Sequence, residues 1–378
     1  MTVRAPAAVG MRLEEVDTPA LILELDAFET NVRRLADAVP GRVRVRAHAK
    51  THKCPEIGKR QVAAGAVGLC CQKVSEAEAM VHGGIPDVLI SNEVVGQQKL
   101  DRLAALAHQA RVMVVADNEI AVEALGAAAA RAGVTIRVLV EIDVGASRCG
   151  VAPGEPAVRL ARRIAREKHL AFAGLQAYQG RAQHLRTFDE RRVAINAAIK
   201  MTAHTVALLK QAGLTCDVVG GAGTGTFELE AASGVYNELQ AGSYCFMDAD
   251  YARNKRADGG AFDTFENALF VYATVMSTPT AERAVVDAGL KAFSFDSGVP
   301  EARGVAGAIY ERPSDEHGNL NVAACNVRPK LGDKILLIPG HCDPTVNLHD
   351  WYIGVRGMGT DSARVESVWP VAARGALF

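Results

Sequence analysis

Lys50 is the first residue whose surroundings in the chain suggest covalent chemistry. It ends a segment, from Arg42 onward, in which valine alternates with arginine, so Arg46, His48 and Lys50 share one face if this segment is extended. Burial in a barrel or sheet crevice lowers the pKa of a lysine amine, which suits imine formation with a carbonyl compound. His48 is expected to pack beneath Lys50. A solvated basic turn is the commoner alternative for one lysine beside arginine and histidine, so the rest of the chain must decide between the two.

A glycine-rich segment, Gly-Gly-Ala-Gly-Thr-Gly-Thr at residues 220–226, follows an apolar run. Glycines let backbone amides approach an anion, and phosphate sites in barrel enzymes favour the loops after the last strands. Gly223, Thr224 and Gly225 are therefore candidates for binding a phosphate group. A simple tight turn is the alternative.

Arg148 leaves another strand-like run, in Glu-Ile-Asp-Val-Gly-Ala-Ser-Arg at residues 141–148. A guanidinium group does not give up its proton, so Arg148 could donate to a ring nitrogen and keep that nitrogen unprotonated. An ion pair with Glu141 or Asp143 is the alternative, and both interpretations can hold together.

His341 and Asp343 end an apolar strand-like run in the last part of the chain. On extended backbone an i, i+2 pair faces one side, and imidazole with carboxylate suits a divalent ion that keeps open positions for water and substrate. A hydrogen-bonded His–Asp pair is the alternative. His184 is a candidate catalytic base, although most single histidines are structural.

The elements that would position these groups follow a regular order. Apolar strand-like runs alternate with helix-like stretches, and with the strand ending at Lys50 they make eight units, the number in a (β/α)8 TIM barrel. The other runs are residues 66–72, 87–92, 111–117, 136–144, 171–179, 217–221 and 239–246. An open doubly wound α/β sheet would show an early glycine-rich turn, which is missing. Most of the strands end in polar groups, among them Gln72, Tyr178 and Tyr244, which we expect to converge at the rim with Lys50.

The chain changes character at about residue 250. Residues 266–277, 283–287, 334–339, 351–355 and 364–371 are strand-like, with little helical periodicity. We therefore predict an α/β barrel domain over residues 24–250 and a second, mostly β C-terminal domain that combines residues 251–378 with residues 1–23.

Composition excludes several classes of protein. The net charge of −1 and the mixed charges give no sign of a nucleic-acid partner, and no apolar run reaches the length of a membrane span. The first ten residues do not resemble a secretory signal, so a cytoplasmic location is expected. Eight scattered cysteines without a CxxC pair are expected to be mostly buried thiols.

Taken together, these residues resemble the D-threonine aldolase and 3-hydroxy-D-aspartate aldolase family of fold-type III, alanine-racemase-like pyridoxal phosphate enzymes. The resemblance extends in order over almost the whole chain. Its most distinctive stretches are Arg-Ala-His-Ala-Lys-Thr-His-Lys at 46–53 and His-Cys-Asp-Pro-Thr at 341–345. The other stretches are residues 17–19, 70–76, 91–94, 148–150, 176–178, 223–225, 238–244 and 287–291.

The resemblance implies a role for each candidate residue. Lys50 would hold pyridoxal 5'-phosphate covalently, Arg148 would face the pyridine nitrogen, and residues 223–225 would bind the phosphate group, with Gln72, Tyr178 and Tyr244 completing the cofactor site. His341 and Asp343 would bind Mn²⁺ or Mg²⁺, and relatives form head-to-tail homodimers. One departure is Ala222, where the family often has a third glycine. A methyl group is tolerable there only if the backbone does not need a positive φ.

The reaction implied by the resemblance is cleavage of a D-β-hydroxy-α-amino acid. The metal ion would acidify the β-hydroxyl group, a base such as His184 would take its proton, and glycine and an aldehyde would be released. D-threonine and 3-hydroxy-D-aspartate stay open as substrates, with Lys53, Arg181 and Arg186 as candidates for binding a second carboxylate. A D-serine or 3-hydroxyaspartate dehydratase, a racemase and a non-catalytic pyridoxal phosphate carrier are the alternatives.

Overall fold

One of the two sheets closes on itself. In the computed structural model, which describes residues 4–378, β2 (Arg44–Val45) and β3 (Ala47–His48) are consecutive parts of one segment. β2 pairs in parallel with β10 (Glu238–Leu239), while β3 pairs in parallel with β4 (Leu69–Cys71). Because the two ends of the sheet belong to one segment, the sheet is a closed cylinder. The predicted (β/α)8 barrel is confirmed.

The other strands of the barrel lie between these ends in chain order, and every pairing is parallel. They are β5 (Asp87–Glu93), β6 (Arg111–Ala116), β7 (Ile136–Glu141), β8 (Leu170–Gln176) and β9 (Val218–Gly221). A separate cluster of buried apolar side chains from successive strands, including Leu89, Met113 and Leu139, packs together. Alternate residues of a parallel barrel strand point inward, which explains this cluster.

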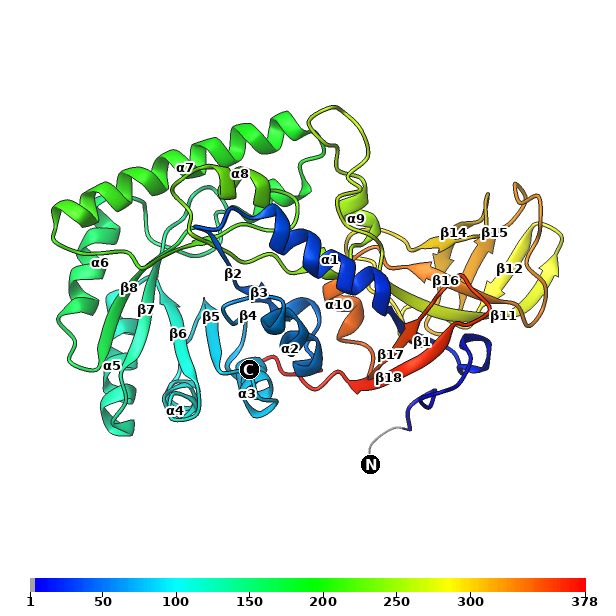
Figure 1. Cartoon of the computed structure of the whole chain (residues 1–378), viewed down its shortest axis with the longest axis horizontal. Helices are drawn as coiled ribbons and strands as arrows, with labels where there is room; N and C mark the ends of the chain where they lie inside the picture. Colours follow the sequence, from blue (N-terminus) through cyan, green and yellow to red (C-terminus); the bar gives the residue numbers. More distant parts are fainter. Residues whose placement is uncertain (1–3) are drawn as a thin grey trace.

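Helices follow the strands and cover the outside of the barrel (Figure 1). They are α2 (Pro55–Ala63), α3 (Val74–His82), α4 (Gln97–Leu106), α5 (Glu119–Ala132), α6 (Glu155–Ala165), α7 (Phe188–Gln211) and α8 (Phe227–Ala232), while α1 (Leu25–Ala38) precedes the first barrel strand. Local signals set their ends. The side chain of Asn118 caps α5 by accepting from the amide of Ala121, and Thr187 with Glu190 forms a capping box at the start of α7. No helix within residues 4–378 is long and apolar enough to cross a membrane.

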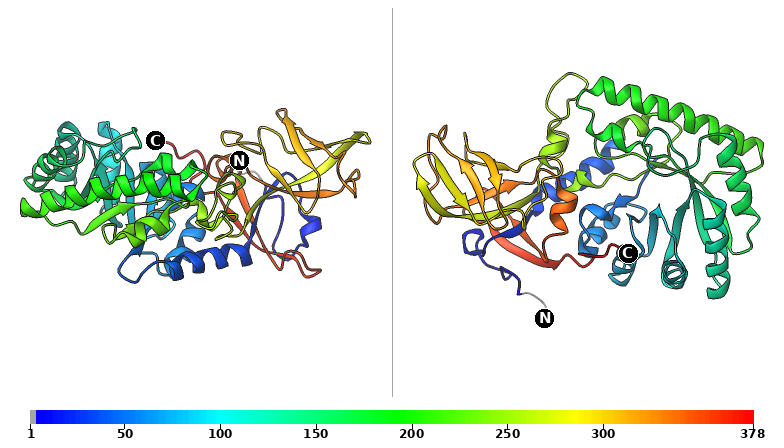
Figure 2. Two further views of the ribbon diagram at one scale, coloured as in Figure 1. Left: turned by 90° about the horizontal axis from the view of Figure 1, so that it is seen from above. Right: turned by 180° about the vertical axis from the view of Figure 1, so that it is seen from behind.

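The second sheet is mostly antiparallel and lies beside the barrel (Figures 1 and 2). It contains β1 (Ala20–Glu24), β11 (Leu269–Thr280), β12 (Arg283–Val286), β13 (Glu301–Arg303), β14 (Ile309–Pro313), β15 (Gly318–Asn321), β16 (Lys334–Ile338), β17 (Trp351–Arg356) and β18 (Arg364–Pro370). The N-terminal strand β1 lies between β11 and β17. The mostly β C-terminal domain is thus confirmed, while its residue boundaries stay a prediction.

Two short helices connect the sheets at the carboxyl end of the barrel. α9 (Ala249–Ala252) follows the last barrel strand, and α10 (Cys342–Val346) follows β16 of the second sheet. The amides of Ala249 and Asp250 donate to the carbonyl oxygens of Pro339 and Gly340 at 3.0 and 3.1 Å. The two parts of the chain therefore meet where the predicted site residues lie.

Candidate active site

A cavity of about 310 Å³ lies at the carboxyl ends of the barrel strands. Parallel barrels place functional side chains at this rim. Of the residues predicted to bind the cofactor, six line this cavity, namely Lys50, Gln72, Arg148, Tyr178, Gly223 and Thr224. The structure thus brings together side chains from five separate loops.

Lys50 lies just beyond the first barrel strand, not on it. The strand ends at His48, and Lys50 is in the 3-10 turn η2 (Ala49–Thr51). Its Nζ is ion-paired with Oδ2 of Asp343. Burial lowers the pKa of Lys50, but the charge of Asp343 and its hydrogen bond outweigh burial, so the pKa is raised. The expectation that the pKa of Lys50 is lowered is therefore wrong, because the amine is in contact with Asp343.

Arg46 and His48 point inward at different depths of the barrel. The guanidinium of Arg46 binds Oδ1 of Asp87 at 2.6 Å and Oε1 of Glu238 at 2.8 Å, two residues that begin their strands at the far end. His48 lies toward the cavity, where Nε2 is 2.9 Å from Nε2 of Gln72. Burial holds the pKa of His48 well below its usual value. A neutral imidazole under the cavity floor agrees with the expected packing role.

Of the two interpretations considered for Arg148, the structure shows the ion pair with Glu141, and donation to a ring nitrogen stays a prediction. Its Nη2 lies 3.6 Å from Oε1 of Glu141, and its guanidinium lies over the ring of Tyr178 at 5.7 Å. Half of its side chain is nevertheless exposed, at 52%. Burial and the neighbouring Glu93 raise the pKa of Glu141 to about 8, although Arg148 opposes this rise. Arg148 is therefore anchored on one side and free to donate on the other.

The glycine loop divides between two cavities. Gly223 and Thr224 line the Lys50 cavity, and Oγ1 of Thr224 is buried without a hydrogen-bond partner among the described residues. Gly225 does not line it: its amide donates to Oε1 of Gln183 at 3.0 Å. A Cβ atom on Gly223 would lie 2.5 Å from the same Oε1. Glycine at 223 is thus required by packing behind the loop, while Thr224, which lines the cavity, has a buried hydroxyl whose hydrogen bonds are unsatisfied within the described residues.

Ala222 has a φ of +69°, in the left-handed region that favours glycine. The condition set for tolerating alanine at this position, a backbone without positive φ, is therefore not met. The chain accepts a local strain of about 1–2 kcal/mol at a residue that lines the cavity.

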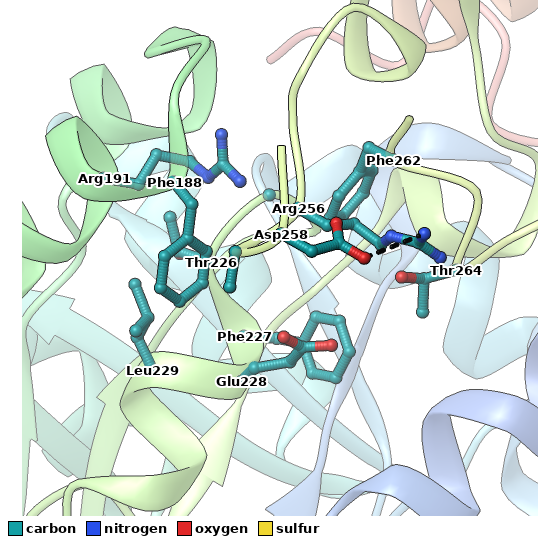
Figure 3. Close-up of a pocket in the computed structure, with 12 residues that line it drawn as sticks. Phe188, Arg191, Thr226, Phe227, Glu228, Leu229, Arg256, Asp258, Phe262 and Thr264 are labelled. Atoms are coloured by element: carbon teal, nitrogen blue, oxygen red, sulfur yellow. Dashed lines mark hydrogen bonds and ion pairs between the residues drawn. The ribbon is translucent and has the colours of Figure 1, made fainter. Parts of the chain in front are cut away.

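The second cavity, of about 380 Å³, lies on the other side of the glycine loop and is lined by Gly225 and Thr226 together with Phe188, Phe227 and Phe262 (Figure 3). Its two arginines have partners within the chain. Arg256 is paired with Asp258 and with Asp263, and buried Arg191 donates to backbone carbonyl oxygens, including those of Leu185 and Lys255. Apart from Gly225, no predicted site residue lies there.

Tyr244 does not reach the Lys50 cavity. Its ring packs against Phe265, and its hydroxyl accepts from Nε2 of Gln61 at 3.1 Å inside the core. The preceding residue, Ser243, lines the cavity instead and donates to Oδ1 of Asp343 at 3.3 Å. The cofactor contact predicted for Tyr244 is corrected accordingly: the chain forms a 3-10 helix here (η4, Ser243–Cys245) in place of the predicted strand, and Ser243 lines the cavity where Tyr244 does not.

His341 has the extended backbone predicted for the pair, with φ −144° and ψ 126°, but Asp343 lies beyond it in a helix. His341 is the N-cap of α10 and Asp343 is in its first turn. Nδ1 of His341 donates to Oδ2 of Asp296 at 2.7 Å. Burial raises the pKa of Asp343, but Lys50 and His341 reverse this effect and hold it well below the ordinary value. Within residues 4–378 no group of three or more His, Cys, Asp or Glu side chains could hold a metal ion.

His184 belongs to the 3-10 turn η3 (Gly180–His184), beyond the sixth barrel strand. Its Nδ1 donates to Oδ2 of Asp250 at 2.7 Å, and its ring stacks on Tyr251, which lines the cavity. Since the carboxylate accepts from Nδ1, the neutral form of this ring carries its proton there and has its lone pair on Nε2. This is the arrangement that a general base requires.

Sequence reasoning missed Ser243, Asp250 and Asp296, each of which contacts a candidate residue. It also proposed three cations for binding a second carboxylate of the substrate. Two of them already form ion pairs within the chain, Lys53 with Glu76 at 2.9 Å and Arg186 with Asp250 at 2.5 Å. Within the described part of the chain, Arg181 has no ion pair with a carboxylate. A sequence signal for Asp250 was present, since it follows the last barrel strand as the other rim residues follow theirs.

Comparison with known proteins shows which families and structures this chain is similar to. Residues 23–250 match the family model "Alanine racemase, N-terminal domain", and residues 268–355 match the "Putative serine dehydratase domain". The chain is 48% identical to a 3-hydroxy-D-aspartate aldolase of Paracoccus denitrificans (98% of this chain, 95% of the relative). It is 47% identical to a D-threonine aldolase of Arthrobacter (98% and 96%). The crystal structure of D-threonine aldolase from Filomicrobium marinum is 54% identical, covers all of both chains and has a TM-score of 0.95.

Proposed function

Because this chain belongs to the family of D-threonine aldolases and 3-hydroxy-D-aspartate aldolases, and is therefore a lyase, we propose that it cleaves D-β-hydroxy-α-amino acids to glycine and an aldehyde with the help of pyridoxal 5'-phosphate and a divalent metal ion. The observation that carries the proposal is the contact between Lys50 and Asp343, which joins the cofactor residue to the metal residue.

The cavity fits a pyridoxal phosphate group by the chemistry of its lining. Lys50 supplies an amine, Arg148 supplies a donor for a ring nitrogen, and Thr224 supplies a buried hydroxyl that lacks a partner within the described chain. Gln72 and Tyr178 complete the lining. When bound, pyridoxal phosphate supplies an electron sink for the charge left on Cα when the Cα–Cβ bond breaks. Gly225 and Tyr244 are not part of this proposal.

The donor set of His341 and Asp343 fits a hard or borderline divalent ion such as Mn²⁺ or Mg²⁺. Asp296 fixes His341 through Nδ1 and leaves Nε2 available. Two protein ligands leave coordination positions for water and for substrate oxygen. A metal ion held here would lower the pKa of a bound hydroxyl group.

His184 is the proposed base. Asp250 holds its ring so that Nε2 can take the proton of the substrate β-hydroxyl group. Tyr251, stacked on His184 and lining the cavity, keeps the ring at the cavity edge. Once that proton is removed, the oxygen becomes the carbonyl oxygen of the departing aldehyde.

The experiment that tests this function is product analysis of the purified protein with D-threonine and with 3-hydroxy-D-aspartate, with and without Mn²⁺. Glycine with acetaldehyde or glyoxylate supports the aldolase. Ammonia with a keto acid would identify a dehydratase, and exchange of the α-proton without cleavage would identify a racemase. Removal of the metal by a chelator and the His341→Ala variant are both expected to abolish cleavage.

The two candidate substrates differ in one group, because 3-hydroxy-D-aspartate carries a second carboxylate that D-threonine lacks. Arg181 is the cation that stays available for it, since Lys53 and Arg186 are paired within the chain. If 3-hydroxy-D-aspartate is preferred, Arg181→Ala will lower kcat/KM for it much more than for D-threonine. A head-to-tail homodimer and a cytoplasmic location stay predictions, as does the absence of nucleic-acid and membrane partners.

A further inference from the structure

The imidazole rings of His184 and His341 are supported in the same way. Each donates from Nδ1 to Oδ2 of one aspartate at 2.7 Å, His184 to Asp250 and His341 to Asp296. Each ring therefore presents Nε2 for chemistry, and its orientation depends on the position of one carboxylate. Correct placement of the two rings relative to each other requires the two carboxylates to be fixed together.

Arg253, the residue after α9, contacts Asp250 directly and reaches Asp296 through Ser297. Its Nη2 donates to Oδ1 of Asp250 at 2.8 Å and also to the carbonyl oxygen of Ser297. Ser297 in turn donates its hydroxyl to Oδ2 of Asp296 at 3.0 Å. One guanidinium group thus connects the carboxylate that orients His184 to the residue that holds the carboxylate orienting His341.

The main chain is already tied across the same boundary, through the amides of Ala249 and Asp250 and the carbonyl oxygens before His341. Those bonds fix the distance between the two chain segments. They do not reach the carboxylate groups, which Arg253 contacts directly or through Ser297. Gly298 allows this contact, since a Cβ atom there would lie 3.3 Å from Nη1 of Arg253.

We propose that Arg253 is a positioning residue that sets the rings of His184 and His341 relative to one another, so that the base and the metal ion act on the same substrate hydroxyl group. This inference rests on the proposed function of the two histidines. Arg186 also donates to Oδ1 of Asp250, at 2.5 Å. Loss of Arg253 therefore leaves Asp250 paired, and misorientation is expected in place of unfolding.

The test compares Arg253→Ala with a matched control, Arg256→Ala, in the holoenzyme. Arg256 lies three residues later, is similarly exposed (44% against 48%) and also pairs with carboxylates, Asp258 and Asp263, but contacts neither histidine support. Mn²⁺ affinity is measured by electron paramagnetic resonance, and kcat and KM are measured with D-threonine. Arg253→Ala is expected to weaken Mn²⁺ binding by about 10-fold and to lower kcat more than it raises KM, as loss of an outer-shell support does.

A double-mutant cycle separates positioning from general loss of structure. The effects of Asp250→Asn and Asp296→Asn on kcat are expected to be non-additive in the wild-type background and additive in the Arg253→Ala background. If Arg253→Ala does not fold, Arg253→Lys replaces it, because lysine keeps a cation but not the planar fork. The same directions with smaller effects are then expected.

Equal effects of Arg253→Ala and Arg256→Ala, or coupling between the aspartates that persists without Arg253, would overturn the inference. Failure of the proposed function looks different: the wild-type protein itself would bind no Mn²⁺ or release no glycine from D-threonine. In that case the role assigned to Arg253 is rejected together with the function.

Discussion

The amine of Lys50 and the carboxylate of Asp343 form an ion pair between the barrel and the helix that follows β16 of the second sheet. Each controls the charge of the other: Asp343 raises the pKa of Lys50, and Lys50 lowers that of Asp343, each against the effect of burial. The residue proposed to bind the cofactor and a residue proposed to bind the metal therefore form one electrostatic unit.

Asp343→Asn is expected to lower the pKa of Lys50. Without the carboxylate, burial is left as the largest influence on the amine, and burial favours the neutral form. Reductive methylation of the cofactor-free protein across a pH series, followed by peptide mass spectrometry, gives the midpoint for Lys50. The midpoint should fall below the ordinary lysine value, while exposed Lys291 serves as the internal control. An unchanged Lys50 midpoint would mean that Asp343 does not govern the amine.

Gly223→Ala is expected to weaken binding of pyridoxal phosphate. The added methyl group would meet Oε1 of Gln183, which also accepts from the amide of Gly225, so the loop must shift. Overpacking of this kind costs about 1–3 kcal/mol, or roughly 5- to 150-fold in affinity if the cost falls on the bound state. Titration by absorbance measures the affinity. Gly41→Ala is the control, since a methyl group at Gly41 meets nothing within 4 Å; equal affinities for the two variants would contradict the role of the loop.

Glu230→Gln is expected to flatten the pH dependence of stability. Burial raises the pKa of Glu230 to about 8 in the folded chain, against 4.5 for the free side chain. Between these values the folded state keeps a proton that the unfolded state has lost. Stability therefore falls as pH rises through this window, by up to about 1.4 kcal/mol per pH unit, and levels off above pH 8.

The glutamine variant lacks this proton, so its free energy of unfolding should fall less steeply between about pH 5.5 and about pH 7.5. Urea denaturation at several pH values measures the difference. Parallel curves for the two proteins would show that Glu230 is already ionised in the fold. Oγ1 of Thr226 donates to Oε1 of Glu230 at 2.9 Å and also accepts from Gln183, so the measurement reports on the support of the glycine loop.

The barrel could be predicted from the sequence because each strand is an apolar run that ends in polar groups, and the repeat of strand and helix is regular. The starts of α5 and α7 are marked by local capping residues, Asn118 and Thr187. The strands β13, β14 and β15 were missed. Each has only three to five residues, with few apolar side chains, and β13 and β15 each pair with a strand far along the chain.

The site was predicted in part, for a similar reason. Rim position identifies Lys50, Gln72 and Arg148, but it does not give the direction of a side chain where the backbone leaves the strand. Tyr244 turns into the core for this reason, while Ser243 faces the cavity. The sequence also does not show which side chains pair over long distances along the chain. For this reason Lys53 and Arg186 were considered available for substrate, although each is paired with a carboxylate.

The central claim, a covalent bond between Lys50 and pyridoxal phosphate, is tested most directly by borohydride reduction and peptide mass spectrometry of the purified protein. We expect the reduced phosphopyridoxyl group on the peptide that contains Lys50, and its loss in Lys50→Ala. A label on another lysine, or no label in a protein that still cleaves D-threonine, would contradict the account.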